Sequence, residues 1–416
     1  MYGWKNLLDE DRRAILEGIR TGEASGGPFH AEFDLIDSCN CQCIFCSYRH
    51  CMNGKSFPWE ILKSLVKDLC RDGLRSVRIY GGGEPSMYPH FADFCALLGD
   101  NGIVLEDLTT NGILLGDLLP SLLNLKIDHV MLSLNYSNPE DHSRFMRSPR
   151  GSFQRVIHNI QSLADGLESR GNRQETLIHI HFFLHKSTVS HFTEMLDLSR
   201  KMPVDLVTIR SIGEIPEEEQ IQPWQIKPLL RTIQREVKAL PIGFPLELDL
   251  SSIGEQTFSD NLLAAHRRIQ VDQIAPLRSI SYCYTPWYNM TILPGGETFP
   301  CCFLDHTPGI LSCGNAFEKP VQDIWNGKEF QRTRYEHRLS YIMEQKTPFQ
   351  ARRFRKTLPC CWNSGSCPLS YLMADPDFYM AAQDILHKLR NRPMTSLLRR
   401  LNRWSRPVIE GVKKCL

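Results

Sequence analysis

Three closely spaced cysteines are the clearest sign of chemistry in this 416-residue sequence. Cys39, Cys43 and Cys46 form a C-x3-C-x2-C pattern on one short segment. Thiolates are soft ligands that select zinc, copper(I) or iron–sulfur clusters, so this spacing predicts a metal centre. A structural zinc site normally has four protein ligands, whereas a [4Fe–4S] cluster held by three thiolates keeps one iron open to chemistry. The three cysteines alone leave both kinds of centre possible.

Hydrophobic periodicity predicts the elements that position this segment. Strand-like and helix-like stretches alternate through the first half of the chain, and the cysteines follow the first strand. Such alternation predicts parallel strands joined by right-handed crossovers, in an open sheet or a partial (β/α)6 TIM-like barrel. The predicted strands are 30–36, 76–80, 103–108, 128–133, 177–184 and 205–209, and the predicted helices between them include 58–70, 89–98, 152–163 and 192–199.

In either arrangement, functional groups collect at the carboxyl ends of the strands. Besides the cysteines, these ends carry the segment 81-GGGEP-85, then Asn111 and Ser133. His185, Lys186 and Arg210 also stand at predicted strand ends, so we expect them to face a substrate in the barrel opening. The alternative that they hydrogen-bond loop backbone is equally open. His179 and His181 alternate along one strand and predict a polar barrel interior.

The second half of the chain has a different character. We assign residues 1–29 to a helical extension, 30–214 to the barrel, and 215–280 to its end and a bridge. Residues 281–372 contain short hairpin elements and many cysteines, which predicts a small α+β domain. Residues 373–416 form a basic helical tail. It could contact RNA or an anionic membrane, but the near-neutral charge of the whole chain favours a solvated helix packed loosely on the body.

Composition excludes several classes of protein. The formal net charge of +1 makes nucleic-acid binding unlikely as the main function, and no apolar run approaches the length of a membrane span. The N-terminal residues lack the apolar core of a secretory signal, so we expect a cytoplasmic protein. Fifteen cysteines in a reducing compartment indicate metal or redox use rather than disulfides.

Together, these motifs resemble the radical S-adenosylmethionine (SAM) enzymes over residues 30–212. The resemblance rests on the three-cysteine motif with Phe45 before its last cysteine, on 82-GGEP-85, on the Thr-Asn-Gly at 110–112, and on Ser133. It implies that Cys39, Cys43 and Cys46 ligate a [4Fe–4S] cluster whose open iron binds SAM. Reductive cleavage of SAM then yields a 5′-deoxyadenosyl radical, which takes a hydrogen atom from the substrate.

The resemblance also assigns roles to the other loops. Backbone groups and the carboxylate at Gly82, Gly83 and Glu84 are expected to meet the methionine ammonium of SAM. Ser133 and Asn111 are expected to hold its carboxylate or ribose, and Phe45 to line the adenine pocket. Flavodoxin or ferredoxin is the expected reductant. Cys41 and Cys51 lie outside the family motif, and Cys41 is interpreted as a bystander.

The C-terminal cysteines resemble the SPASM/twitch module that carries auxiliary [4Fe–4S] clusters. The matching features are 283-CxxPW-287, Gly296 four residues before Cys301, 314-GN-315 and 323-DIWN-326. The two-cluster pattern is incomplete, because Leu358 and Tyr371 stand where cysteines would be. One auxiliary cluster is therefore expected, and zinc held by the same four cysteines is the alternative. The expected ligands are Cys283, Cys301, Cys361 and Cys367, with Cys302, Cys313 and Cys360 as rivals.

Two substrate classes are compatible with this resemblance. The first is a peptide or protein that is crosslinked, oxidised or epimerised; the second is a sugar or aminocyclitol in natural-product biosynthesis. Fewer than 40 residues precede Cys39, so no N-terminal leader-peptide module is expected. Cys302 is a candidate hydrogen donor in an epimerisation, and a buried thiol is the alternative. A non-catalytic iron–sulfur or zinc protein is the hypothesis from another class, and it predicts no SAM cleavage.

Overall fold

A single curved sheet organises the computed structural model, which describes residues 5–49, 52–213, 215–241, 243–253, 285–301, 312–335 and 338. Within these residues, ten strands run in the order β10-β9-β8-β1-β2-β3-β4-β5-β6-β7. Neighbours from β8 to β7 are parallel, whereas β9 and β10 are antiparallel to their neighbours. The strands are β1 (His30–Asp34), β2 (Ser76–Tyr80), β3 (Val104–Thr110), β4 (His129–Asn135), β5 (Leu177–Leu184), β6 (Leu206–Ser211), β7 (Leu246–Asp249), β8 (Asn289–Ile292), β9 (Glu297–Phe299) and β10 (Gly314–Asn315).

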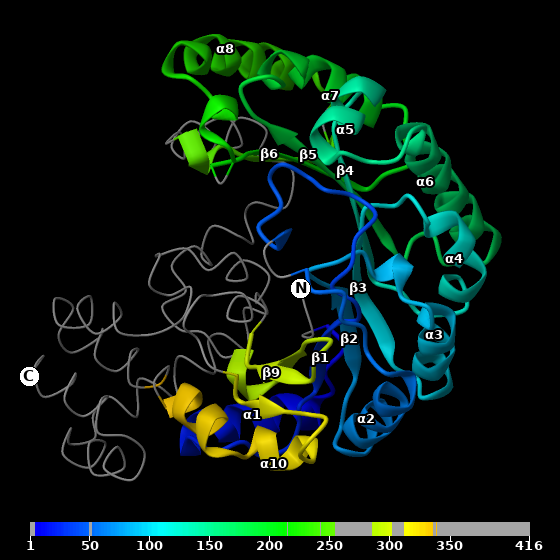
Figure 1. The fold of residues 1–416 in the computed structure, drawn as a ribbon, viewed down its shortest axis with the longest axis vertical. Coiled ribbons are helices and arrows are strands. Elements are labelled where there is room, and N and C mark those ends of the chain that lie inside the picture. Colours follow the sequence, from blue (N-terminus) through cyan, green and yellow to red (C-terminus); the bar gives the residue numbers. More distant parts are fainter. Residues whose placement is uncertain are drawn as a thin grey trace, which may run out of the picture.

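Helices cover the convex face of this sheet, and the concave face is opposite to them (Figure 1). Phe33 of β1 shows how the layers join, because its ring packs edge-on against Phe57 and Phe94 in the buried core. The predicted alternation of strands and helices in a partial barrel is therefore confirmed. The helices are α1 (Asp9–Thr21), α2 (Trp59–Arg71), α3 (Phe91–Asp100), α4 (Leu115–Leu122), α5 (Pro139–Met146), α6 (Ser152–Ser169), α7 (Phe192–Ser199), α8 (Pro223–Ala239) and α10 (Val321–Trp325).

The sheet extends beyond the six strands expected from the sequence. β7 adds a seventh parallel strand beside β6, and β8 pairs in parallel with β1 at the other end. β8 lies beyond residue 281, so the sheet continues from the barrel into the cysteine-rich region. Its pairing with a strand about 250 residues earlier is a tertiary contact, which local periodicity does not encode.

One helix that matters for the site was missed. α5 is short and mostly polar, so it carries little hydrophobic periodicity. Its start depends instead on capping: the Asn138 side-chain oxygen accepts a hydrogen bond from the Asp141 amide at 2.9 Å, and Pro139 occupies the first turn.

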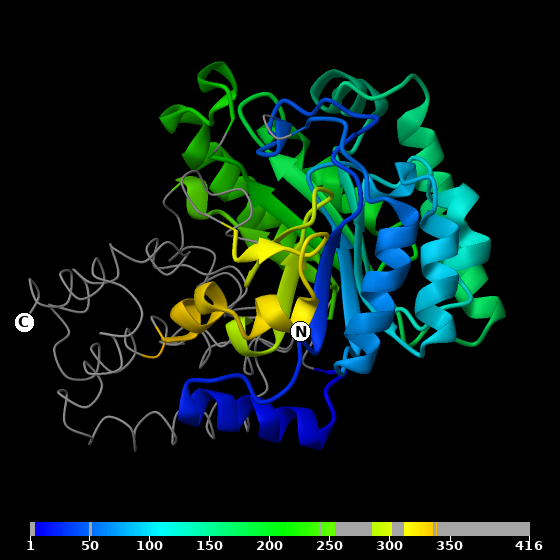
Figure 2. The same ribbon diagram turned by 60° about the horizontal axis from the view of Figure 1, so that its bottom comes forward.

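The two ends of the described chain pack together at one side of the sheet, where α1 and α10 lie near each other (Figure 2). The Trp325 indole donates a hydrogen bond to the Gly26 carbonyl at 2.8 Å. Arg334 is fully buried over the ring of Trp325 and donates to the carbonyl oxygens of Pro286 and Trp325. These contacts attach the start of the cysteine-rich region to the segment that precedes β1.

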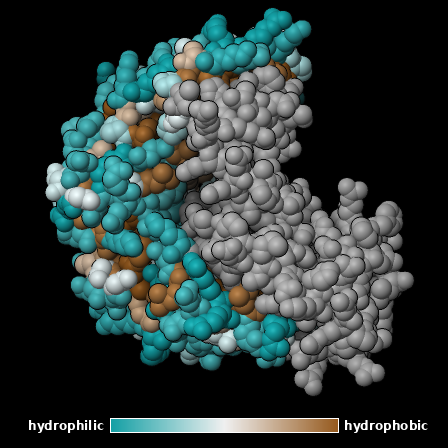
Figure 3. All heavy atoms as spheres, turned by 180° about the vertical axis from the view of Figure 1, so that it is seen from behind, coloured by the Kyte–Doolittle hydropathy of each residue, from teal (hydrophilic) through white to brown (hydrophobic). Residues whose placement is uncertain are grey.

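On the face shown in Figure 3, the described residues are mostly hydrophilic, with hydrophobic residues in patches between them. None of the helices described by the structure is long and apolar enough to cross a membrane.

Candidate functional site

The cysteine loop follows β1 and is fastened to α5. The amides of Gln42 and Ile44 donate hydrogen bonds to the carbonyl oxygens of Met146 and Phe145, at 2.9 and 3.0 Å. The loop is thus held from its backbone, which leaves its side chains free for other contacts. The missed helix α5 is consequently part of the structure that positions the three cysteines.

The three motif cysteines are partly exposed, whereas Cys41 between them is buried with 2 % of its surface accessible. Hydrogen bonding to Cys41 lowers the pKa of Cys39, while bonding to Cys39 and Cys43 raises the pKa of Cys41. Cys41 is therefore a buried protonated thiol among ligand candidates, which agrees with its interpretation as a bystander.

A [4Fe–4S] cluster and a single zinc ion place different demands on these cysteines. A mononuclear zinc site needs ligands that converge on one position, whereas each thiolate of a [4Fe–4S] cluster binds its own iron. The three motif thiols are partly exposed on one loop at a strand end, so they are accessible to such a cluster. Among the residues that the structure describes, no group of three or more His, Cys, Asp or Glu side chains converges on one metal position.

The glycine-rich loop after β2 packs directly against the cysteine loop. The Glu84 amide donates to the Ser38 carbonyl at 2.9 Å. A Cβ atom on Gly83 would lie only 2.3 Å from the carbonyl oxygens of Ile36 and Ser38. Glycine is needed here because the two backbones touch.

The carboxylate of Glu84 is engaged within the protein. Glu84 is 2 % exposed and accepts hydrogen bonds from the Thr110 hydroxyl at 2.6 Å and the Asn111 amide at 2.7 Å. It also accepts from the amide and hydroxyl of Ser86. Burial raises the pKa of Glu84, and these four donors oppose that rise. This carboxylate braces β3 against the glycine loop, and its expected contact with an ammonium group stays a prediction.

Of the other predicted residues, Asn111 uses its side chain in hydrogen bonds within the protein, whereas the Ser133 hydroxyl does not. The Asn111 side-chain nitrogen donates to the Asn40 oxygen at 2.6 Å and also contacts the sulfurs of Cys39 and Cys41, so it ties the cysteine loop to β3. Ser133 lies within β4 rather than after it; it is partly exposed, and its hydroxyl makes no hydrogen bond with the described residues. Its hydroxyl is therefore open to a ligand.

Phe45 connects the cysteine loop to the far side of the barrel. Its ring packs edge-on against Phe183 at 4.6 Å between centroids and lies 6.2 Å from Tyr136. It thus provides an apolar wall beside the cysteines, as the predicted adenine pocket requires.

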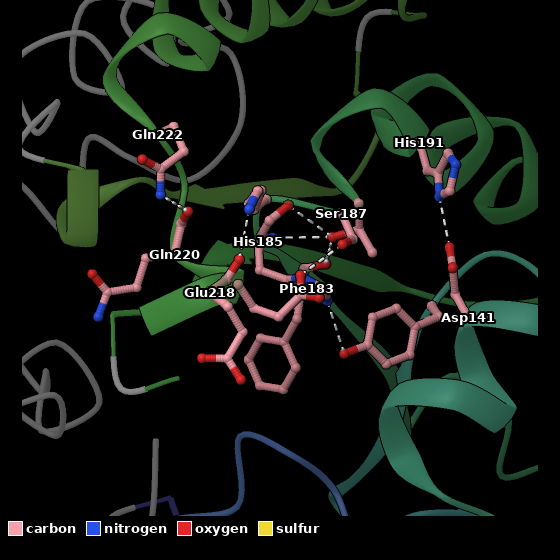
Figure 4. A network of polar contacts seen from close by, with 12 residues as sticks. Asp141, Phe183, His185, Ser187, His191, Glu218, Gln220 and Gln222 are labelled. Atoms are coloured by element: carbon pink, nitrogen blue, oxygen red, sulfur yellow. Dashed lines mark hydrogen bonds and ion pairs between the residues drawn. The ribbon is translucent and has the colours of Figure 1, made fainter. Parts of the chain in front are cut away.

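His185 lies inside a hydrogen-bonded network rather than at the barrel opening (Figure 4). It is fully buried, with Nδ1 3.0 Å from Glu219 and Nε2 3.2 Å from the Tyr136 hydroxyl. Ser187 donates to the same Glu219 carboxylate at 2.7 Å. Burial lowers the pKa of His185 despite this carboxylate. Both ring nitrogens are occupied, so neither is available to a substrate.

The other two substrate candidates differ from His185. Lys186 is exposed and its ammonium donates to the Glu218 carbonyl at 2.9 Å. Arg210 forms an ion pair with Asp249 at 2.9 Å, on the concave side of β6 and β7. Of the three, only Arg210 lines the concave face.

A polar belt crosses the concave face from β8 to β7, and sequence reasoning found only one of its residues, His179. At its β8 end, Thr291 donates to Glu32 at 2.6 Å, and Arg78 pairs with Glu32 and with Asp107. The remaining links run through the next four strands. Polar residues alternating with apolar ones along each strand were the available signal. The belt comprises Asn289, Thr291, Glu32, Arg78, Asp107, His129, His179, Thr208 and Glu247.

Most predicted auxiliary-cluster residues lie outside the described residues: Cys283, Cys302, Cys360, Cys361 and Cys367, together with Cys51 and the tail 373–416. Cys301 is within them and is buried. Burial raises the pKa of Cys313 to about 12.

Asp34 leads to a prediction about pH. Its Oδ2 accepts the Gly82 amide at 2.9 Å, its Oδ1 has no hydrogen-bond partner, and burial raises its pKa to about 7. The unfolded carboxyl titrates near 3.9, so the folded protein holds an extra proton between roughly pH 4 and 7. The free energy of unfolding should therefore fall as the pH rises through that window.

Asp34→Asn should remove this part of the slope, because an amide does not titrate. Urea unfolding of the wild type and the variant at several pH values between about 4.5 and 8 measures this slope. The range spans the raised pKa of Asp34. Equal slopes in the wild type and the variant would contradict the prediction.

Residues 34–209 match the family model described as the radical SAM superfamily. Residues 283–368 match a second model, SPASM, described as an iron–sulfur cluster-binding domain.

Two curated relatives align with this chain at low sequence identity. A probable GTP 3′,8-cyclase of Methanococcus maripaludis is 24 % identical over 256 residues, which cover 60 % of this chain and 76 % of the relative. A GTP 3′,8-cyclase of Clostridium perfringens is 28 % identical over 229 residues, covering 53 % of this chain and 66 % of the relative.

Solved structures share the fold. Streptococcus suis SuiB bound to the precursor peptide SuiA has a TM-score of 0.53 and 18 % identity, covering 77 % of this chain and 69 % of SuiB. The structure described as native anSMEcpe with bound AdoMet and Cp18Cys peptide has a TM-score of 0.51 and 15 % identity, covering 87 % and 98 % of the two chains.

Proposed function

Because this chain belongs to the radical SAM superfamily and carries a C-terminal SPASM iron–sulfur domain, we propose that it modifies a peptide or protein substrate by removing a hydrogen atom from it. Its cofactors are SAM, the SAM-binding [4Fe–4S] cluster and an auxiliary iron–sulfur cluster. When bound, SAM and the reduced cluster supply the 5′-deoxyadenosyl radical that abstracts the hydrogen atom.

One observation carries the proposal: three partly exposed thiols follow directly on Ile36 and Ser38, whose backbone the glycine loop touches. Cys39, Cys43 and Cys46 would hold the SAM-binding cluster. Backbone groups at Gly82 and Gly83 and the open hydroxyl of Ser133 would orient SAM. Glu84 would act through the loop that it braces, since its carboxylate already receives four hydrogen bonds.

The auxiliary cluster is assigned within the matched C-terminal region. Cys283, Cys301, Cys361 and Cys367 would ligate it. Cys302 would be the hydrogen donor if the reaction is an epimerisation. Flavodoxin or ferredoxin would supply the electron for the SAM-binding cluster.

The charges of the concave face support a peptide substrate over a nucleotide triphosphate. The described parallel strands contain two permanent cations, Arg78 and Arg210, and both are ion-paired with carboxylates. A triphosphate needs cations that are not neutralised by the protein. The belt itself carries three carboxylates, Glu32, Asp107 and Glu247, against one arginine, and this excess of negative charge disfavours a triphosphate further. The names of the curated relatives favour GTP, so GTP is the second candidate.

Anaerobic reconstitution followed by an assay for 5′-deoxyadenosine tests the proposal. Two [4Fe–4S] clusters correspond to about eight irons per chain, and one to about four. Formation of 5′-deoxyadenosine should increase on adding a peptide encoded beside this gene. A larger increase with GTP, or with a sugar or aminocyclitol, would overturn the peptide assignment. The absence of any 5′-deoxyadenosine would favour a non-catalytic iron–sulfur protein.

A further inference from the structure

Five belt residues form a series of polar contacts across five neighbouring strands, from β3 to β7, which begins with an ion pair and continues through three hydrogen bonds. His129 Nδ1 lies 2.7 Å from Asp107, and His129 Nε2 lies 3.1 Å from His179 Nδ1. His179 Nε2 lies 2.8 Å from the Thr208 hydroxyl, which is 2.9 Å from Glu247. We name these residues the five-residue chain: Asp107, His129, His179, Thr208 and Glu247.

Donor and acceptor roles along this chain allow two arrangements. If Thr208 donates to the Glu247 carboxylate, His179 must donate Nε2–H to Thr208 and accept at Nδ1. His129 then carries both ring protons, one facing Asp107 and one facing His179. If Glu247 is protonated and donates to Thr208, the donors of the three links between His129 and Glu247 reverse, and His129 is neutral with its one ring proton on Nδ1, facing Asp107. Each arrangement satisfies every link, because imidazole and hydroxyl groups both donate and accept.

The two arrangements differ by the transfer of one proton. The N–H bond at His129 Nε2 breaks and one forms at His179 Nδ1. The N–H bond at His179 Nε2 breaks and an O–H bond forms on Thr208. The original Thr208 O–H bond breaks and one forms on Glu247. No electron moves, and the net change is a proton passed from His129 to Glu247.

The two ends of the five-residue chain differ in their exposure to solvent. Asp107 is fully buried; burial would raise its pKa, but His129 and Arg78 hold it well below its usual value. This carboxylate stabilises a charged His129. Glu247 at the other end is exposed to solvent, where it exchanges protons with water.

His179, in the middle of the five-residue chain, and Thr109, beside its buried end, are also consistent with the transfer of a proton along it. Burial, with the nearby charge of His129, lowers the pKa of His179 to about 3, and His179 carries a single proton in both arrangements. Thr109, two residues nearer the carboxyl end of β3, is partly exposed and donates to Asp107 at 3.2 Å. It links the buried end to the region where a substrate would bind.

We propose that the five-residue chain is a proton relay between the concave face of the barrel and solvent at the β7 edge. It would carry a proton released by a bound substrate, and this use rests on the proposed function. In that case the overall reaction is one that liberates a proton inside the barrel, such as a dehydrogenation. The relay itself is a property of the folded chain and can be measured without substrate.

The experiment measures exchange with water of the His179 ring N–H proton, by NMR of ¹⁵N-histidine-labelled holoenzyme with oxidised clusters. In the wild type, exchange should be fast although His179 is buried. In Thr208→Val it should be at least about tenfold slower, because the proton then leaves only when the region opens. Thr208→Ser keeps the hydroxyl and should exchange at nearly the wild-type rate.

Glu247→Gln is the second variant, at an exposed position where folding is not at stake, and it should also slow exchange. Equal rates in the wild type and Thr208→Val would overturn the relay. Equally slow rates in Thr208→Val and Thr208→Ser would attribute the effect to packing and would also overturn it. Since no turnover is involved, these outcomes are independent of whether SAM is cleaved.

Discussion

Replacing Cys43 with alanine is expected to lower the iron content of the reconstituted protein by about four atoms and to abolish 5′-deoxyadenosine formation. Cys43 is one of three partly exposed thiols on the loop that α5 holds in place. Two remaining thiolates cannot retain a cluster that already lacks a fourth protein ligand. Iron and sulfide analysis, with the assay for 5′-deoxyadenosine, measures both effects.

Cys41→Ala is the matched control, because Cys41 lies two residues away on the same loop but is buried and protonated. We expect this variant to keep its iron and its ability to cleave SAM. The same loss in Cys41→Ala as in Cys43→Ala would show that the loop collapses when either thiol is removed. Retention of iron by Cys43→Ala would contradict the assignment of Cys43 as a ligand.

Replacing Gly83 with alanine is the second change with a large expected effect. The new methyl group would meet two carbonyl oxygens at 2.3 Å and the Ser38 amide nitrogen at 2.7 Å. These are backbone atoms, so the glycine loop and the cysteine loop must separate. The separation would break the hydrogen bond from the Glu84 amide to Ser38. We expect weak or absent SAM binding, with a loss of stability of about 1–3 kcal/mol.

Equilibrium binding of SAM to the reconstituted protein and urea unfolding test this prediction. Gly99→Ala in α3 is the control, because its methyl group meets only the end of the Leu125 side chain at 3.3 Å. In a helix, alanine is favoured over glycine, so this variant should be at least as stable as the wild type. Normal SAM affinity in Gly83→Ala would contradict the close contact between the loops.

The candidate site was predictable wherever the chemistry depends on residue type and spacing along the chain. The C-x3-C-x2-C spacing, the Gly-Gly-Glu-Pro segment and the strand before each of them are local features. Their positions at strand ends followed from alternating strands and helices, and the structure confirms the partial barrel. Ser133 was identified in the same way, although it lies inside β4.

Partners of side chains were less predictable. Glu84 and Asn111 were expected to face SAM, but each hydrogen-bonds across loops that are distant in sequence. His185 was expected at the opening, and its partners Tyr136 and Glu219 lie 49 and 34 residues away along the chain. A polar residue at a strand end has several possible neighbours, and only the folded chain selects among them.

By itself, the sequence determined the parallel partial barrel and the three-cysteine loop, because these depend on local spacing and periodicity, and the resemblance of its motifs to a known family indicated the cofactor class. Tertiary structure alone decided that β8 pairs with β1, that α5 holds the cysteine loop, and that Glu84 braces β3. It also assembled the five-residue chain, whose members come one from each of five strands. The physical reason is the same in each case: hydrogen bonds between strands and loops depend on register and proximity in space, which no local pattern specifies.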